Sequence, residues 1–93
     1  MKLQWDEAKN KANIRKHGID FADAWQLFEH PLVTWHDDRF DYDEDRYIGI
    51  GMMNDMMVVI MVFVERGTDT IRVISMRKAK KHERERYQTA FKD

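Results

Sequence analysis

The chain has 93 residues with 4 Gly and 1 Pro, a length and composition that predict one compact domain over residues 1–93. It has no Cys, which excludes disulfides and thiolate chemistry and favours a cytoplasmic location, and its longest apolar run, Met56–Val64, is too short to cross a membrane. The formal net charge of −1 excludes non-specific coating of nucleic acid, but residues 66–93 hold 9 Lys and Arg against 4 Asp and Glu, which permits a local phosphate-binding surface.

The first predicted elements are a short strand over Met1–Trp5 and a helix that begins after Asp6 and ends near His17. The Asp6 carboxylate can accept hydrogen bonds from the free amides of the first helical turn. Gly18 can supply the left-handed residue that ends such a helix. We expect the inward-facing residues to be the few apolar ones, Ala8, Ala12 and Ile14.

A second helix is predicted between Asp20 and Pro31, which would end it because proline cannot continue a helix. Apolar residues recur in it at i, i+3, i+4 and i+7, the spacing of one face of an α-helix. These residues are Phe21, Ala24, Trp25 and Phe28. On this interpretation, truncation of Trp25 or Phe28 would cost about 3–5 kcal/mol of stability.

From Leu32 onward the pattern changes to a run of strands followed by one helix. The predicted strands are Leu32–Trp35, Tyr47–Met53, Met56–Val64 and Thr70–Met76, and the predicted helix is Lys80–Phe91. Helices and strands are therefore segregated along the chain, with two helices before the strands. This order is typical of an α+β fold with an antiparallel sheet of three to four strands.

The loop Asp37–Asp45 has six carboxylates in nine residues, and three of them have the opening rhythm of a calcium loop. Arg46 and Met52 occupy the positions where such a loop needs glycine and glutamate, so we predict no calcium site. The four histidines lack metal-ligand spacing, and we predict no metal. We also expect no cofactor, since the sequence has no phosphate-binding or dinucleotide-binding glycine motif.

The remaining candidates for chemistry are cations at the ends of the predicted strands. We expect Arg46 to share one edge of the sheet with Arg77 and Lys78, and Arg66 to lie at the opposite edge. Converging arginines can bind a phosphate and stabilise the transition state of phosphoryl transfer. Salt bridges from Arg72 and Arg77 to the acidic loop are an equally good interpretation of the same residue types.

Four stretches of the sequence together resemble the BrnT family of type II toxin–antitoxin systems. They are Trp5-Asp6-x-x-Lys9 with Asn13-x-x-Lys16-His17-Gly18-Ile19 and Phe21; Ala24-x-x-x-Phe28 with Pro31-Leu32; Arg46-x-Ile48-x-Ile50-Gly51; and Glu65-Arg66-Gly67 with Ile71-Arg72-x-Ile74-Ser75-x-Arg77-Lys78-Ala79 and Glu83-Arg84-x-x-Tyr87. Two positions depart from the family pattern. Phe63 stands where the family usually has Tyr, and Lys80 stands where many members have a Thr or Ser that caps the last helix.

The resemblance implies a RelE-like fold and a metal-independent endoribonuclease that leaves a cyclic phosphate and arrests translation. The site residues would have three roles. The catalytic residues would be Arg77, Arg66 and Arg46. The RNA-binding residues would be Lys78, Arg72, Lys16 and His17, although His17 can equally cap its own helix. Glu65 would orient Arg66.

The resemblance also implies a cognate antitoxin of the BrnA type with a ribbon-helix-helix domain, through which operator DNA is bound indirectly. Two assemblies remain open, a homodimer and a toxin–antitoxin heterotetramer. The alternative function is a non-catalytic co-repressor that binds its antitoxin. The last helix is the expected antitoxin interface; the alternative is that it docks on its own sheet through Tyr87 and Phe91.

Overall fold

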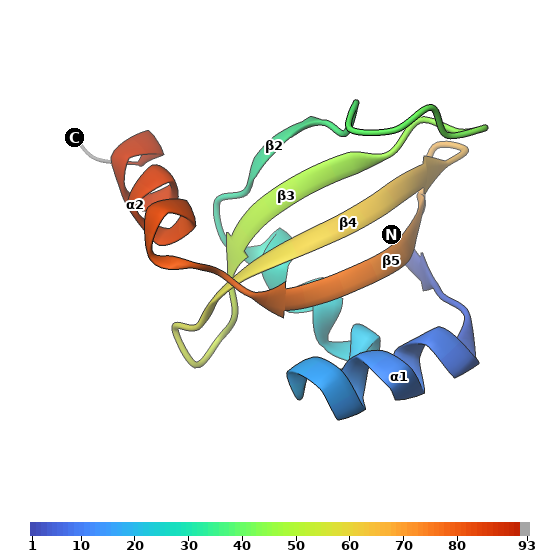
Figure 1. Ribbon diagram of the computed structural model, residues 1–93, viewed down its shortest axis with the longest axis horizontal. Coiled ribbons are helices and arrows are strands. Elements are labelled where there is room, and N and C mark those ends of the chain that lie inside the picture. The colour runs from blue at the N-terminus through green and yellow to red at the C-terminus, as the bar shows by residue number, and fades with distance from the viewer. Residues whose placement is uncertain (92–93) are drawn as a thin grey trace.

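A five-stranded sheet in the order β1-β5-β4-β3-β2 forms the centre of the computed structural model, which describes residues 1–91 (Figure 1). The elements in chain order are β1 (Lys2–Gln4), α1 (Glu7–His17), the 3-10 helix η1 (Phe21–Glu29), β2 (Val33–His36), β3 (Tyr47–Met52), β4 (Val58–Arg66), β5 (Thr70–Lys78) and α2 (Lys81–Ala90). The α+β prediction is confirmed. The sheet is mixed rather than antiparallel throughout, because β1 pairs in parallel with β5. No helix among the described residues is long and apolar enough to cross a membrane.

Strand β4 is apolar along most of its length because both of its faces are buried. Val59, Met61 and Phe63 belong to the core beneath α1 and η1. The alternate residues, such as Ile60 and Val62, belong to a second core on the opposite face, which includes Tyr87 of α2. Figure 1 shows α1 below the sheet and α2 beyond one end of it. The helices therefore divide the sheet into a covered face and a face that α2 covers only in part.

The second predicted helix is a 3-10 helix, which changes the residues that it buries. Its buried residues are Phe21, Ala24 and Leu27, at intervals of three, because side chains at i and i+3 eclipse each other in a 3-10 helix. The side chain of Trp25 is 41% exposed, so the prediction that it belongs to the buried face is wrong. Phe28 is half-buried and lies edge-on to Phe63, with ring centroids 6.3 Å apart.

Helix α1 docks on the sheet through two buried asparagines rather than through its alanines. Asn13 donates to the Ile19 carbonyl at 2.9 Å and accepts from the Met76 amide at 3.2 Å. Asn10 accepts from the Phe21 amide at 2.8 Å and so fixes the start of η1. The three residues expected to face inward are all exposed, and that prediction is wrong; they are Ala8, Ala12 and Ile14.

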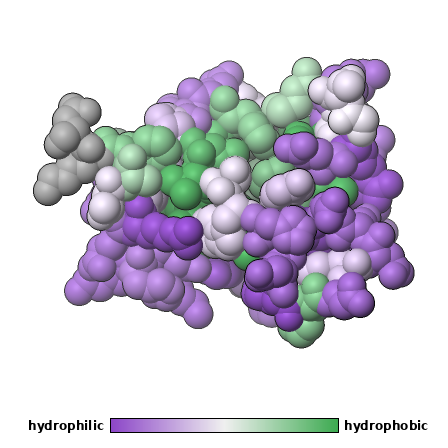
Figure 2. Space-filling view, turned by 90° about the horizontal axis from the view of Figure 1, so that it is seen from above, coloured by the Kyte–Doolittle hydropathy of each residue, from purple (hydrophilic) through white to green (hydrophobic). Residues whose placement is uncertain are grey.

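Helix α2 lies against its own sheet through Tyr87, whereas Phe91 is 44% exposed and stands edge-on to Tyr87; its role as an antitoxin interface stays a prediction. The hydroxyl of Tyr87 donates to the Pro31 carbonyl at 2.8 Å, and Arg86 lies 4.0 Å above the ring of Trp35. The side chain of Lys80 makes no cap hydrogen bond, but the Glu83 carboxylate accepts from the Lys80 amide at 2.8 Å. In Figure 2, apolar residues gather beside the C-terminal end of α2, whereas hydrophilic residues cover most of the remaining surface in view.

The 3-10 geometry predicts which residue of η1 carries stability. Leu27→Ala should lower the free energy of unfolding by about 2–5 kcal/mol, because a fully buried leucine is truncated. Trp25→Ala should lower it by about 1 kcal/mol, since much of that ring is already in solvent. Urea unfolding of both variants measures the difference. A larger loss for Trp25→Ala than for Leu27→Ala would show that η1 packs as an α-helix in solution.

Candidate functional site

A cleft of about 330 Å³ lies on the partly covered face of the sheet, between α2 and the loop that follows β2. Its apolar lining comes from alternate residues of β3 and β4, namely Ile48, Ile60 and Val62. Its polar lining comes from β2, the following loop, β5 and α2, and consists mainly of His36, Asp37, Asp38, Arg39, Ser75, Arg77 and Glu83. Charged groups thus meet over an apolar floor, an arrangement typical of ligand sites.

Arg77 reaches the cleft from β5, where it is paired with Ile60 of β4. Its two terminal nitrogens donate to the two carboxylate oxygens of Glu83, each at 2.8 Å. These hydrogen bonds lower the pKa of the Glu83 carboxyl from 4.5 to about 2 and raise that of Arg77. Glu83 also accepts a hydrogen bond from the Lys80 amide. The same carboxylate therefore caps the N-terminus of α2 and orients the guanidinium of Arg77 on the sheet.

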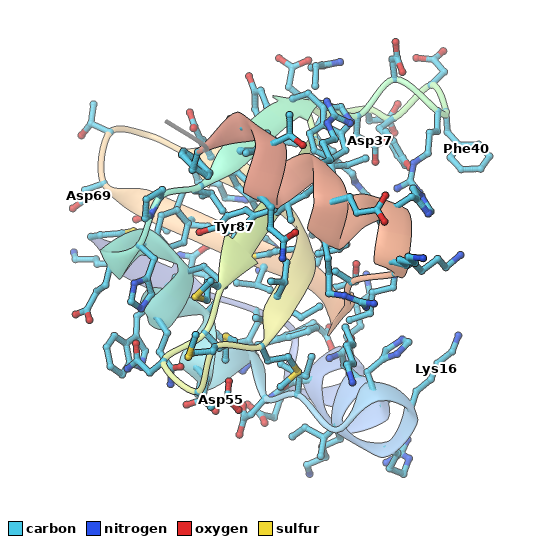
Figure 3. The ribbon with its side chains drawn as sticks, turned by 90° about the vertical axis from the view of Figure 1, so that its left-hand side faces the viewer. Lys16, Asp37, Phe40, Asp55, Asp69 and Tyr87 are labelled. Carbon is cyan, nitrogen blue, oxygen red and sulfur yellow. The ribbon has the colours of Figure 1, made fainter. Side chains whose placement is uncertain are left out.

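A second guanidinium–carboxylate pair lies in the loop after β2. The Nε and one terminal nitrogen of Arg39 donate to the two oxygens of Asp37 at 2.8 and 2.9 Å. The hydroxyl of Tyr42 donates to the same carboxylate at 3.3 Å. Chiefly through the Arg39 hydrogen bond, the pKa of Asp37 falls to about 2. Figure 3 shows that Asp37 lies at the inner end of this loop and Phe40 at its outer part.

In both pairs the cation is more exposed than its carboxylate. The side chain of Arg39 is 56% exposed and that of Asp37 is 0% exposed. The corresponding fractions are 34% for Arg77 and 16% for Glu83. The positive charge of Arg39 also lowers the pKa of Arg77 against the effect of Glu83, so the two guanidiniums repel each other. The cleft lining sets these two guanidiniums against three carboxylates, Asp37, Asp38 and Glu83, so an anion such as a phosphate would bind through unused guanidinium donors and not through net charge.

His36 adds a titratable ring to the lining of the cleft. Its Nε2 lies 3.3 Å from a carboxylate oxygen of Asp45, and its ring stands edge-on to Tyr47 with centroids 5.7 Å apart. These contacts fix the ring while the side chain remains 53% exposed.

Phe63, by contrast, is buried in the core on the other face of the sheet. A hydroxyl at position 63 would therefore not reach the cleft.

The prediction that Arg46 shares an edge with Arg77 is wrong. Strand β3 is antiparallel to β4, which places Tyr47 opposite Phe63 and so puts Arg46 at the same end as Arg66. Both arginines approach Glu44, at 3.5 Å from Arg46 and 3.1 Å from Arg66. Arg66 follows Ile60, the partner of Arg77, by six residues along β4, a separation of about 20 Å.

The other predicted residues are spread around the sheet. Glu65 and Arg66 line one hollow, whereas Arg72 lies in another hollow beside β1 with Trp5 and Glu7. Lys16 and His17 are exposed at the end of α1, which packs on the face opposite the cleft. Lys78 follows Arg77 but lines a different hollow. Of the residues predicted for one site, the cleft contains Arg77 alone.

Sequence reasoning missed His36, Asp37, Arg39 and Glu83 as site residues. One of the two interpretations paired the acidic loop with Arg72 or Arg77, but Arg77 pairs with Glu83, while Glu44 of the loop pairs with Arg46 and Arg66. One available signal was the position of Asp37 directly after a strand. Among the described residues, no group of three or more His, Asp or Glu is arranged to hold a metal ion.

Comparisons with known proteins agree with this architecture. Residues 5–83 match the family described as ribonuclease toxin, BrnT, of type II toxin–antitoxin systems. Among solved structures, the chain is similar to the 1.1 Å crystal structure of the Brucella abortus ribonuclease toxin BrnT. The two are 35% identical with a TM-score of 0.65, and the match covers 87% of this chain and 99% of that chain. No curated protein matches the sequence.

The lowered pKa of Glu83 predicts an acid-sensitive contribution to stability. A carboxyl with a pKa of about 2 when folded and an ordinary value of 4.5 when unfolded stabilises the fold above pH 4.5, and this contribution is lost as the pH falls toward 2. Glu83→Gln should therefore have a lower Tm than the parent at pH 7, and the gap should shrink between pH 4.5 and 2. Glu85→Gln, on the exposed side of the same helix, is the matched control and should show no such gap. A gap for Glu83→Gln that does not depend on pH would exclude the pairing.

Proposed function

The chain belongs to the BrnT family of ribonuclease toxins, and on this premise we propose that it is a metal-independent endoribonuclease whose site is the cleft between α2 and the loop after β2. One observation carries the location. Arg39 and Arg77, each held by its own carboxylate, both line the same cleft. Hydrogen-bond donors that already point to the position where negative charge develops in the transition state lower the barrier of a reaction at phosphate.

Both arginines retain donors for a phosphate. A guanidinium has five N–H donors, of which Arg77 uses three, two with Glu83 and one with the Lys78 carbonyl. Arg39 uses two with Asp37. The free donors can bind the non-bridging oxygens of the scissile phosphate and hold them as the phosphorane forms. Glu83 and Asp37 are positioning residues, since carboxyls with a pKa of about 2 are weak bases at neutral pH.

The nucleophile of the proposed reaction belongs to the substrate. The 2′-oxygen of RNA attacks the adjacent phosphorus and the 5′-oxygen leaves, which yields a 2′,3′-cyclic phosphate and a free 5′-hydroxyl. One proton must leave the 2′-hydroxyl and one must reach the departing 5′-oxygen. We assign removal of the 2′-hydroxyl proton to His36, because it lines the cleft and an imidazole can accept a proton, and the departing 5′-oxygen takes its proton from water.

The cluster of Arg46, Arg66 and Glu44 is the second candidate for the phosphate site, with Glu65 beside it. Two guanidiniums meet there at the carboxylate of Glu44, with Glu65 and Asp45 beside them, so the cluster offers guanidinium donors without a net positive charge. The two locations are far enough apart along β4 for single substitutions to separate them.

In either case, we propose that RNA cleavage arrests translation and that a BrnA-type antitoxin neutralises the toxin and links it to operator DNA.

The proposal predicts that the fork of Arg77 matters as well as its charge. Arg77→Lys keeps a cation but cannot bind Glu83 and phosphate bidentately, so RNA cleavage should fall roughly 100-fold. Purified protein is incubated with RNA in EDTA, and the products are analysed for cyclic phosphate ends. Arg15→Lys, an exposed arginine on α1, is the matched control and should cleave like the parent. In cells, induction of the parent alone should stop growth and that of Arg77→Lys should not.

Two outcomes would contradict this assignment. Full activity of Arg77→Lys together with loss of activity in Arg66→Ala would move the site to the other end of the sheet. Absence of cleavage by the folded parent, with its antitoxin binding intact, would favour the co-repressor alternative. Circular dichroism of each variant shows whether a loss reflects unfolding.

A further inference from the structure

A shallow hollow of about 360 Å³ lies between the β3–β4 turn and the start of α2. It is lined by Asp55, Met56, Met57, Val58, Lys78 and Arg84. Figure 3 views the molecule from this side, with Asp55 at the tip of the turn below α2. As far as the structure describes the chain, the hollow and the cleft share no lining residue. The hollow is therefore a surface that the proposed ribonuclease chemistry does not use.

Met56 occupies an unfavourable backbone conformation in this turn. Its φ is +71°, in the left-handed region that glycine and asparagine adopt more easily than other residues. Its amide donates to the Met53 carbonyl at 2.9 Å, which holds this conformation. Its side chain is 75% exposed and so contributes little to the core. The left-handed residue closes the hairpin turn between β3 and β4, and it leaves the Met56 side chain in solvent at the tip of the turn, where it is available to a partner.

The turn is fixed to η1 by side-chain hydrogen bonds. The amide of Asn54 donates to the Gln26 side-chain oxygen at 2.9 Å, and a ring nitrogen of His30 lies 3.0 Å from the side-chain oxygen of Asn54. Asp55 accepts from the Met57 amide at 3.0 Å, so its carboxylate is engaged within the turn. Because the turn is already ordered, it loses little conformational entropy when a partner binds it.

The rim of the hollow favours an acidic partner. Lys78 and Arg84 line it, and the exposed Lys80 and Lys81 follow at the start of α2. Lys16 projects from the end of α1 on the same side of the molecule (Figure 3). A second copy of the chain would bring these cations against each other, because a two-fold interface pairs the same patch with itself. An amphipathic segment with carboxylates beside apolar side chains complements both the charge and the methionines.

We propose that this hollow docks an acidic, amphipathic segment of the cognate antitoxin, with Met56 as its apolar anchor and Lys78 and Arg84 as partners of its carboxylates. The identity of the partner rests on the proposed function as a toxin of a type II system. The docking itself requires no catalysis. An antitoxin held there reaches the residue that follows Arg77 and lies against the first turns of α2, the helix that carries Glu83.

Met56→Asn tests the anchor, since asparagine tolerates the left-handed conformation but is polar. The variant should melt no lower than the parent and should bind purified antitoxin at least about tenfold more weakly by calorimetry. Lys78→Gln should weaken binding and reduce its dependence on salt. Ile14→Ala removes another exposed apolar side chain, on α1, and should bind like the parent. Met56→Gly repeats the test in case asparagine disturbs the turn.

Unchanged antitoxin affinity in folded Met56→Asn and Met56→Gly would overturn the proposal. So would a dimer of the free toxin that Met56→Asn dissociates, because the occupant would then be a second copy. An equal loss of affinity for a 2′-deoxy oligonucleotide would assign the surface to nucleic acid instead. The calorimetry contains no RNA, so an inactive ribonuclease would leave its result intact and would count against the proposed function alone.

Discussion

The pair between Arg77 and Glu83 is the interaction on which the arrangement of the cleft depends. It joins the end of β5 to the first turn of α2 through two hydrogen bonds of 2.8 Å. The same carboxylate supplies the helix start that Lys80 cannot cap with its side chain. A helix as polar as α2 would be marginal in isolation. One residue therefore holds the helix on the sheet and orients the guanidinium that faces the cleft.

The two cores explain why the cleft lies where it does. On one face, η1 and α1 cover the core that contains Val59, Met61 and Phe63 of β4, and two asparagines satisfy the buried backbone groups of the junction. On the other face, α2 covers only one end, and Tyr87 anchors it to the Pro31 carbonyl. The uncovered part retains an apolar floor, over which charged groups from β2, β5 and α2 meet. A phosphate held there would be partly removed from water, where its contacts with arginine are stronger.

Local patterns predicted the elements of the fold well, and pairings between distant segments poorly. The capping Asp6, the left-handed Gly18, the largely apolar strand β4 and the final helix all follow from short-range chemistry that the sequence displays, although β4 lies two residues later than predicted. The burial of Leu27 in place of Trp25 could not be predicted from the sequence. The same segment has apolar residues at both 3-10 and α-helical spacing, and only packing against the sheet selects the 3-10 helix. Asn10 and Asn13 look like solvent-exposed residues until the backbone groups that they satisfy are known.

The candidate site was predicted in one part only. Arg77 was identified from its residue type at a strand end, but its partner lies on a helix and depends on how α2 crosses the sheet. The error over Arg46 came from topology, since antiparallel pairing reverses the end at which a strand begins. The Asp37–Arg39 pair lies within a loop that composition alone describes as acidic and solvated. Charge composition thus favours the kind of ligand that we propose, but it does not give the set of residues that line the cleft.

The central claim is that Arg39 and Arg77 bind the scissile phosphate in the cleft, and NMR titration tests it most directly. A 2′-deoxy-substituted RNA dinucleotide, which cannot be cleaved, is added to ¹⁵N-labelled protein while the backbone amides and arginine Nε–H signals are followed. We expect the largest shifts at Arg39, Arg77 and Ser75, with small changes at Arg46 and Arg66. Shifts confined to Arg46, Arg66 and their neighbours would contradict the account.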